Sequence, residues 1–350
     1  MKIETNSFFD KITEALNAEL PFVAYRHPET NTVKGIFQKS TDLYRTKNYV
    51  ESGFLFAPFD DVNSAVLFPL AESAMYTTIL FDIDVKNTCE QLELEAINAE
   101  RRHIDLVQKG IDFLKTAGVE KVVLSRKEII DRSSFNVVEI FKKLLLNYTN
   151  AMVYVWFHPK VGLWMGASPE TLLKVQDNLF KTMALAGTQS YQGSLDVVWQ
   201  QKEIQEQQFV TDYIVEKLDK DVTVSDVKTI KAGSLLHLCT TISGKLSREF
   251  TLFKLINLLH PTPAVCGLPK DEAKRFILEN EGYDREFYTG FFGELNIDNS
   301  SNLFVNLRCM QVLSKQLALY IGGGITSGSI PQKEWEETVA KSKVILKVLS

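Results

Sequence analysis

Cysteine is scarce in this sequence, and the few cysteines present share no pattern. No two of them stand at C-x-x-C spacing, and no histidine is placed to complete a zinc site with Cys89, Cys239, Cys266 or Cys309. A disulfide framework and a structural zinc site are therefore not expected. We predict reduced, partly buried thiols in a cytoplasmic protein.

Long apolar runs and blocks of like charge are missing as well. No apolar stretch approaches the length of a membrane span, and residues 1–5 lack the basic region and apolar run expected of a signal peptide. The net charge is -5, without an acidic or basic block, so neither nucleic acid nor a membrane is an expected partner. A protein of this charge that binds an acidic substrate needs local cations, either basic side chains or a metal.

What the sequence does contain is an ordinary apolar content, with two kinds of spacing in alternation. Hydrophobic residues make up 45% of 350 residues, which allows a sizeable buried core. Helical spacing predicts helices at 8–16, 89–117, 137–146, 200–218, 253–259, 271–281 and 332–349. Short apolar runs predict strands at 65–70, 122–124, 152–157, 163–167, 171–175, 179–185, 222–230, 235–246, 291–295, 303–312 and 317–321. Many strands are close neighbours in sequence, which favours antiparallel pairing and an α+β fold.

Two helices carry pairs of glutamates three residues apart, Glu203 with Glu206 and Glu334 with Glu337. This spacing places each pair on one side of its helix. If the two pairs faced each other, they would form a hard-oxygen site suited to Mg²⁺. Such pairs are common on helices, however, and spacing alone favours a solvated face.

A run of three glycines, Gly322 to Gly324, lies between a predicted strand and the last helix. Glycines let backbone N–H groups approach an anion closely, so the run indicates either an anion site or a tight strand-to-helix turn. It is neither a dinucleotide-binding G-x-G-x-x-G motif nor a P-loop, because no ribose-binding acid or Gly-Lys-Ser/Thr follows.

Four single residues could carry chemistry. Glu170 ends a turn between apolar strands, where partial burial would raise its pKa and suit a general acid, although such a carboxylate is more often solvated. Lys121 heads a strand and is either a surface lysine or a base. Arg308 stands inside the predicted strand 303–312 and needs an anionic partner. His237 fits a satisfied core histidine better than a catalytic one.

Together these segments resemble the chorismate-utilising family, which contains isochorismate synthases, salicylate synthases and the large subunits of anthranilate and aminodeoxychorismate synthases. The resemblance runs from about Lys121 to Lys343. Its blocks, in the order of the family, stand at 121–126, 166–170, 186–188, 202–206, 236–238, 260–264, 284–286, 306–308, 322–325 and 334–338. Any one block is weak, but ten in the same order make coincidence very improbable.

The resemblance implies a fold like that of anthranilate synthase component I. This fold has two packed, largely antiparallel β-sheets flanked by helices in a single domain over 1–350. We expect a divergent N-terminal part at 1–90 and a catalytic core at 91–350. The implied substrate is chorismate, and the implied cofactor is Mg²⁺.

The resemblance also assigns roles to matching positions. Glu206 and Glu337 look like direct Mg²⁺ ligands, and Glu203 and Glu334 like ligands acting through water. Tyr288 and Arg308 resemble the grip on the enolpyruvyl carboxylate of the substrate. The other expected substrate-binding positions are Thr188, His237, Ala264, Gly322, Gly324 and Lys341.

Two positions distinguish the members of the family. Aminodeoxychorismate enzymes generally carry a nucleophilic lysine where this chain has Ala186, and anthranilate synthases lack the lysine found here at 121. The resemblance therefore implies an isochorismate synthase, an isomerase in which Lys121 activates water for attack at C2 and protonated Glu170 assists loss of the C4 hydroxyl. Salicylate synthase, which further eliminates pyruvate, and a non-catalytic chorismate-binding protein remain alternatives.

The expected partner is the small molecule chorismate alone, with no glutaminase subunit, and the expected state is a monomer or weak dimer. The product would serve menaquinone or siderophore synthesis. One departure from many relatives is Gln207, which stands where they have a histidine. We expect this change to tune the surroundings of the metal site without loss of the metal.

Overall fold

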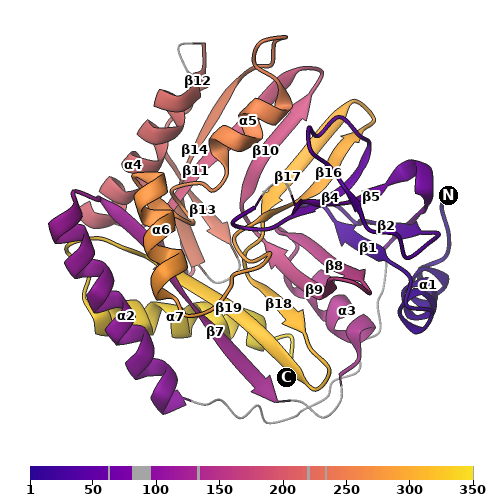
Figure 1. The fold of residues 1–350 in the computed structure, drawn as a ribbon, viewed down its shortest axis with the longest axis horizontal. Coiled ribbons are helices and arrows are strands. Elements are labelled where there is room, and N and C mark those ends of the chain that lie inside the picture. The colour runs from indigo at the N-terminus through magenta and orange to yellow at the C-terminus, as the bar shows by residue number, and fades with distance from the viewer. Residues whose placement is uncertain (62–63, 81–95, 132–134, 219–220, 233–234, 350) are drawn as a thin grey trace.

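Two antiparallel β-sheets form the frame of the protein, as a computed structural model shows for residues 1–61, 64–80, 96–131, 135–218, 221–232 and 235–349. Seven helices lie around the sheets in these ranges (Figure 1). The predicted α+β fold with two packed, antiparallel sheets is confirmed. Among the described helices, none combines the length and the apolar character needed to cross a bilayer.

The first sheet contains strands from both ends of the chain. In the described residues its order is β15 (Gly267–Leu268), β7 (Lys121–Asp131), β19 (Gln316–Ile325), β18 (Cys309–Val312), β9 (Gly162–Ser168), β8 (Met152–His158), β1 (Phe22–Arg26), β2 (Thr32–Gln38) and β6 (Ser73–Ile79). The long strands β7 and β19 pair along ten positions, from Gln316 opposite Asp131 to Ile325 opposite Val122.

The second sheet also contains strands from distant parts of the chain. In the described residues its order is β12 (Thr223–Val224), β14 (Leu235–Lys245), β11 (Leu179–Ser190), β10 (Thr171–Gln176), β17 (Ser300–Val305), β16 (Phe291–Ile297), β4 (Gly53–Ala57), β5 (Val66–Pro69) and β3 (Tyr44–Arg45), with β13 (Lys228–Ala232) paired to β14. The predicted strand 222–230 is therefore two short strands, because β12 and β13 pair with different parts of β14.

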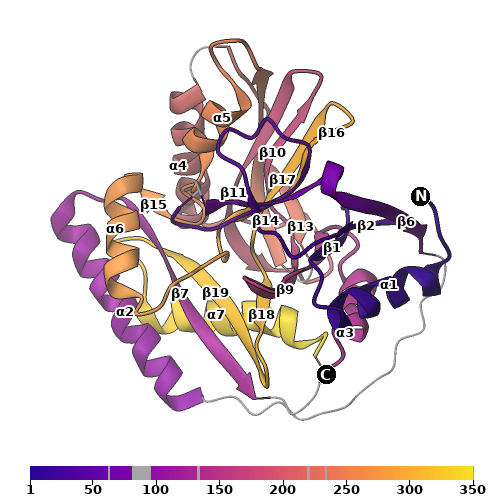
Figure 2. The same ribbon diagram turned by 45° about the vertical axis from the view of Figure 1, so that its right-hand side comes forward.

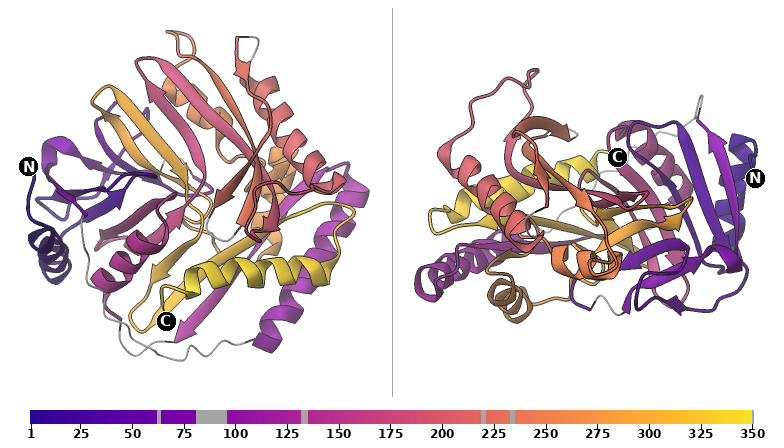
Figure 3. Two further views of the ribbon diagram at one scale, coloured as in Figure 1. Left: turned by 180° about the vertical axis from the view of Figure 1, so that it is seen from behind. Right: turned by 90° about the horizontal axis from the view of Figure 1, so that it is seen from above.

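The helices cover the outer faces and ends of the two sheets. The pair α2 (Ala96–Ala117) and α7 (Pro331–Leu346) lies against β7 and β19, while α4 (Gln201–Leu218) lies against β11 and β14 (Figures 1 and 2). Seen from behind, α7 crosses the sheet beside α2 (Figure 3). The remaining helices are α1 (Thr5–Asn17), α3 (Val137–Asn147), α5 (Leu252–Leu259), α6 (Lys270–Asn280) and the short η2 (Leu70–Glu72).

Aromatic side chains join the two sheets. Trp156 of β8 stacks on Phe56 of β4, with 4.7 Å between ring centroids, and on Phe68 of β5, with 5.1 Å. All three side chains are fully buried. Large aromatic rings bury much apolar area and pack with defined geometry, so this contact fixes the position of one sheet relative to the other.

The N-terminal part contributes strands to both sheets. In the first sheet β1 pairs with β8, and in the second β4 pairs with β16. The described part of the helix predicted at 89–117 is α2, and Cys89 lies outside the described residues. The other three cysteines are buried free thiols, as predicted. The division of a single domain near residue 90 stays a prediction.

The predicted strand 303–312 is wrong, because the chain changes sheets within it. Strand β17 belongs to the second sheet and β18 to the first, and Arg308 lies between them with φ +49°. Asn306 holds the crossing: its amide donates to the carbonyl of Phe287 at 2.9 Å and accepts from the hydroxyl of Tyr154 at 2.7 Å. Arg308 therefore lies in the connection between the two sheets and not inside a strand.

Of the two interpretations of the three glycines, an anion site or a tight turn, the turn is wrong. Strand β19 continues through Gly322, Gly323 and Gly324, which pair with Ser125, Leu124 and Val123 of β7. The chain turns only afterwards, where the amide of residue 329 donates to the carbonyl of residue 326 at 3.0 Å. The glycines therefore form a stretch of strand without side chains, facing the cavity described next.

Candidate active site

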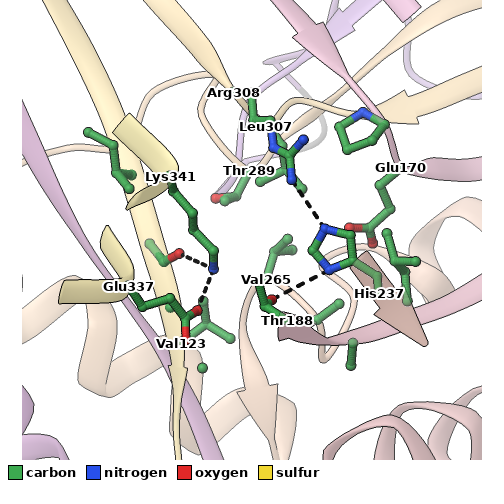
Figure 4. Close-up of a pocket in the computed structure, with 18 of the residues that line it drawn as sticks. Val123, Glu170, Thr188, His237, Val265, Thr289, Leu307, Arg308, Glu337 and Lys341 are labelled. Carbon is green, nitrogen blue, oxygen red and sulfur yellow. Dashed lines mark hydrogen bonds and ion pairs between the residues drawn. The ribbon is translucent and has the colours of Figure 1, made fainter. Parts of the chain in front are cut away.

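A cavity opens where the two sheets and the helices α4 and α7 meet (Figure 4). The predicted site residues that line it are Glu170, Thr188, Glu203, Glu206, His237, Ala264, Tyr288, Arg308, Gly322, Gly324, Glu337 and Lys341. The two others, Lys121 and Glu334, form ion pairs with lining residues. Residues up to 220 positions apart in the sequence (Lys121 and Lys341) thus gather around one cavity.

A buried ion pair lies at the start of β7. The Nζ atom of Lys121 stands 2.8 Å from Oε1 of Glu206 on α4, and the lysine side chain is 1% exposed. Burial acts to raise the pKa of Glu206, but Lys121, Lys341 and Lys202 together hold it below its usual value. Glu206 is therefore ionised and Lys121 is held in place.

Gly324 makes room for this pair. A Cβ atom at this position would lie 2.6 Å from Oε1 of Glu206 and 2.9 Å from Cε of Lys121. Real Cβ contacts are essentially never this short, so a side chain here would displace the ion pair. The glycine has a steric role in the site, and no backbone conformation that requires glycine is involved.

The glutamates of α7 are also paired with lysines. Oε1 of Glu334 stands 2.9 Å from Nζ of Lys202, and Oε1 of Glu337 stands 2.7 Å from Nζ of Lys341. The Lys341 ammonium also donates to the carbonyl of Gly322 at 2.9 Å (Figure 4). Glu334 is 3% exposed. Glu206 is 16% and Glu337 32% exposed, and both line the cavity. The carboxylates of the two helices therefore belong to one cavity, with Glu334 the most buried of these three.

The donor set could hold a hard cation. Oε2 of Glu203 is buried and has no hydrogen-bond partner, and oxygens of Glu334 and Glu337 flank Gly323, at 3.9 and 3.5 Å from an ideal Cβ there. In the ranges that the structure describes, no three histidine, cysteine or acidic side chains are close enough together to hold a metal as they stand. Three of the four glutamates form an ion pair with a lysine. The Mg²⁺ site therefore stays a prediction.

Glu170 is a buried acid at a crossing between the sheets, directly after β9 and before β10. It is 4% exposed. Burial raises its pKa to about 8, although Lys121 and Arg308 act to lower it. A carboxyl group with this pKa is mostly protonated at neutral pH and can donate a proton.

His237 is neutral and holds Arg308. Burial and the neighbouring arginine lower the histidine pKa to about 3. Its Nδ1 lies 2.8 Å from the carbonyl of Gly187 and must carry the proton, so its Nε2 accepts from Arg308 at 3.1 Å (Figure 4). Burial lowers the pKa of Arg308 to about 10, which leaves the guanidinium charged. The core-histidine interpretation is thus incomplete, since His237 also orients a cation in the cavity.

Sequence reasoning missed two residues that shape the cavity. Arg285, fully buried, donates to the carbonyls of Val123 at 2.8 Å and Val265 at 2.9 Å, and both of these residues line the cavity. Lys202 holds Glu334. Both residues lie inside sequence blocks that resemble the family, so the resemblance could have identified them.

The amide of Gln207 donates to the hydroxyls of Thr211 and Thr240 rather than to a glutamate, and so connects α4 to β14.

Comparisons with known proteins show the family and the fold to which this chain is similar. Residues 73–350 match the family model described as chorismate binding enzyme. Isochorismate synthase EntC of Escherichia coli (strain K12) is 31% identical over 274 residues, covering 73% of this chain and 69% of that protein. Isochorismate synthase DhbC of Bacillus subtilis (strain 168) is 27% identical over 315 residues, covering 83% and 79%. The solved structure of MenF, the menaquinone-specific isochorismate synthase from Escherichia coli, has the same fold, with a TM-score of 0.79, 20% identity and coverage of 94% and 89%.

Proposed function

Since this chain belongs to the family of chorismate binding enzymes, we propose that it is an isochorismate synthase. The reaction is the conversion of chorismate to isochorismate by addition of water at C2 and loss of the C4 hydroxyl. One observation supports this most strongly: a buried, largely protonated acid, Glu170, and a buried amine, Lys121, belong to the same site. The relatives named as isochorismate synthases support the same choice.

The substrate is a dicarboxylate, and the cavity offers cations to bind it. Arg308 is held by neutral His237, so its guanidinium is positioned before the substrate arrives. A planar guanidinium suits a carboxylate because it can donate two parallel hydrogen bonds. Tyr288 adds a hydroxyl close to Gly322, since a Cβ there would lie 2.8 Å from that oxygen. We assign Arg308 and Tyr288 to the enolpyruvyl carboxylate.

The four glutamates are the proposed holders of Mg²⁺. Glu206 and Glu337 would bind the ion directly, and Glu203 and Glu334 through water. The unpartnered buried oxygen of Glu203 and the all-carboxylate donor set support this assignment. Bound Mg²⁺ would supply Lewis-acid polarisation of the ring carboxylate.

The acid–base steps use this chain's own residues. Lys121, as the neutral amine, takes a proton from the water whose oxygen forms the bond to C2. Both double bonds of the ring diene shift by one position, from C1=C2 and C5=C6 to C1=C6 and C4=C5, as the C4–O bond breaks. Glu170 donates its proton, so that the hydroxyl leaves as water. One water is consumed and one is released, so the reaction is an isomerisation. Glu206, whose Oε1 lies 2.8 Å from Nζ of Lys121, is also a proposed Mg²⁺ ligand, so the metal and the base share one carboxylate.

Product analysis tests the proposal. Purified protein with chorismate and Mg²⁺ should give isochorismate on chromatography, with no requirement for ammonia or a glutaminase subunit. Lys121→Ala and Glu170→Ala should each remove turnover. Salicylate with pyruvate as the main products would instead establish a salicylate synthase. An inert unsubstituted protein would establish a binding protein.

We further propose a cytoplasmic monomer or weak dimer whose product serves menaquinone or siderophore synthesis. Proteins named for both routes are similar to this chain: the menaquinone-specific isochorismate synthase MenF of Escherichia coli in fold, and the vibriobactin-specific isochorismate synthase of Vibrio cholerae in sequence.

A further inference from the structure

Lys202 differs from the other two lysines that pair with site glutamates. Its side chain is 42% exposed at the rim of the cavity, whereas its partner Glu334 is 3% exposed. Lys121 is 1% exposed, and the Lys341 ammonium also donates to a backbone carbonyl. Lys202 is therefore the lysine that can leave its glutamate by turning into solvent.

Several acidic groups surround the ammonium of Lys202. Besides the 2.9 Å contact with Glu334, its Nζ lies 3.5 Å from Oγ of Ser329. Lys202 also lines the cavity together with Glu203, Glu206 and Glu337. Its ammonium group therefore belongs to the same cavity as the glutamates proposed to hold the metal.

We infer that the ammonium group of Lys202 and a divalent cation compete for the same carboxylates, so that a metal binds by displacing Lys202 from Glu334 toward the solvent. The inference rests on the proposed function, which assigns the four glutamates to the metal. A buried carboxylate without a counter-ion is strongly unfavourable, so Glu334 needs a cation at all times. The four-carbon stem of lysine allows its charge to move outward while the stem stays packed.

Competition predicts that removing Lys202 tightens metal binding. The ammonium of Lys202 competes only weakly with a metal, because its ion pair with Glu334 is partly exposed to solvent. We therefore expect the Kd for Mg²⁺ to be about fivefold lower in Lys202→Met. The same variant should melt at a lower temperature without Mg²⁺, because Glu334 loses its partner. Its melting temperature should then rise further on addition of Mg²⁺ than that of the unsubstituted protein.

Calorimetric titration with MgCl₂ in the absence of chorismate, at fixed pH and about 0.15 M salt to screen distant charges, tests the inference. The matched control is Lys217→Met, which removes the same charge from the same helix, where the ammonium lies over the Tyr213 ring. Lys202→Arg keeps the charge and the partner, and its Kd should stay within about twofold of the unsubstituted value. Circular dichroism confirms that each variant is folded.

The outcomes separate the inference from the proposed function. A lower Kd in Lys202→Met alone supports competition. An equal or higher Kd in that variant, or an equal decrease in Lys217→Met, overturns it while the proposed metal site stands. If the folded, unsubstituted protein gives no heat with Mg²⁺, the metal assignment fails and the inference fails with it.

Discussion

Replacement of Glu170 by glutamine should stabilise the protein while removing its activity. The pKa of this carboxyl is about 8 in the fold, against 4.5 as the ordinary value, because the group is buried. The folded state therefore keeps the proton to higher pH than the unfolded state does. The resulting contribution to stability is complete below pH 4.5, falls as pH rises from 4.5 to 8, and is constant above. At pH 7 the loss is about 3 kcal/mol, from about 1.4 kcal/mol for each of about 2.5 pH units.

Glutamine cannot ionise, so Glu170→Gln should escape this loss. We expect urea unfolding to show a difference of less than about 1 kcal/mol at pH 5 that grows to about 3 kcal/mol at pH 7, in favour of the variant. The matched control is Glu216→Gln at an exposed position of α4, which should change stability by less than about 0.5 kcal/mol. Turnover of the unsubstituted protein should fall as pH rises through 8. The reasoning would be refuted if the stability difference between Glu170→Gln and the unsubstituted protein were no larger at pH 7 than at pH 5. Full turnover by the variant would refute it as well.

Three other substitutions test the geometry of the site. Gly324→Ala should lower kcat by about a hundredfold, because the new methyl group displaces the ion pair beneath it; Gly328→Ala, where a Cβ meets nothing within 4 Å, should leave steady-state kinetics unchanged. Lys121→Met should destabilise the fold by about 3 kcal/mol in thermal or urea unfolding, since it strands a buried carboxylate, and an added Glu206→Gln should recover part of this. Arg308→Lys should raise KM for chorismate by about tenfold, with a smaller effect on kcat, because the bidentate fork is lost; an unchanged KM would remove Arg308 from substrate binding.

The amphipathic elements could be predicted from the sequence, whereas most of the N-terminal strands could not; the exception is the strand predicted at 65–70, which is β5. The helices α1, α3 and α4 each have one buried face, which leaves a readable period. Strands β1 and β4, in contrast, are buried at every position. Strands covered on both faces lose the alternation that identifies a strand, so the front of the chain carried little signal.

The site residues illustrate a different limit. Spacing alone favoured a solvated face for Glu334, and only the resemblance indicated its place beside a cavity. The partner that buries its charge is Lys202, 132 positions away in the sequence. No local pattern encodes such a contact, because it depends on how α4 and α7 are placed by the sheets. The connection between the sheets at Arg308 could not be predicted either, because the mostly apolar residues on both sides of it read as one strand.

The acid and the substrate-binding arginine stand on two of the connections by which the chain passes from one sheet to the other. Glu170 follows β9 of the first sheet and precedes β10 of the second, and Arg308 joins β17 of the second to β18 of the first. The crossings are bonded to each other: the amide of Val305 donates to the carbonyl of Glu170 at 3.0 Å, and that of Ala167 to the carbonyl of Arg308 at 3.2 Å. Any relative movement of the sheets therefore carries both groups together. Lys121 stands at the start of β7, which belongs to the first sheet alone, so the acid and the arginine are joined to each other by backbone hydrogen bonds that the base does not share.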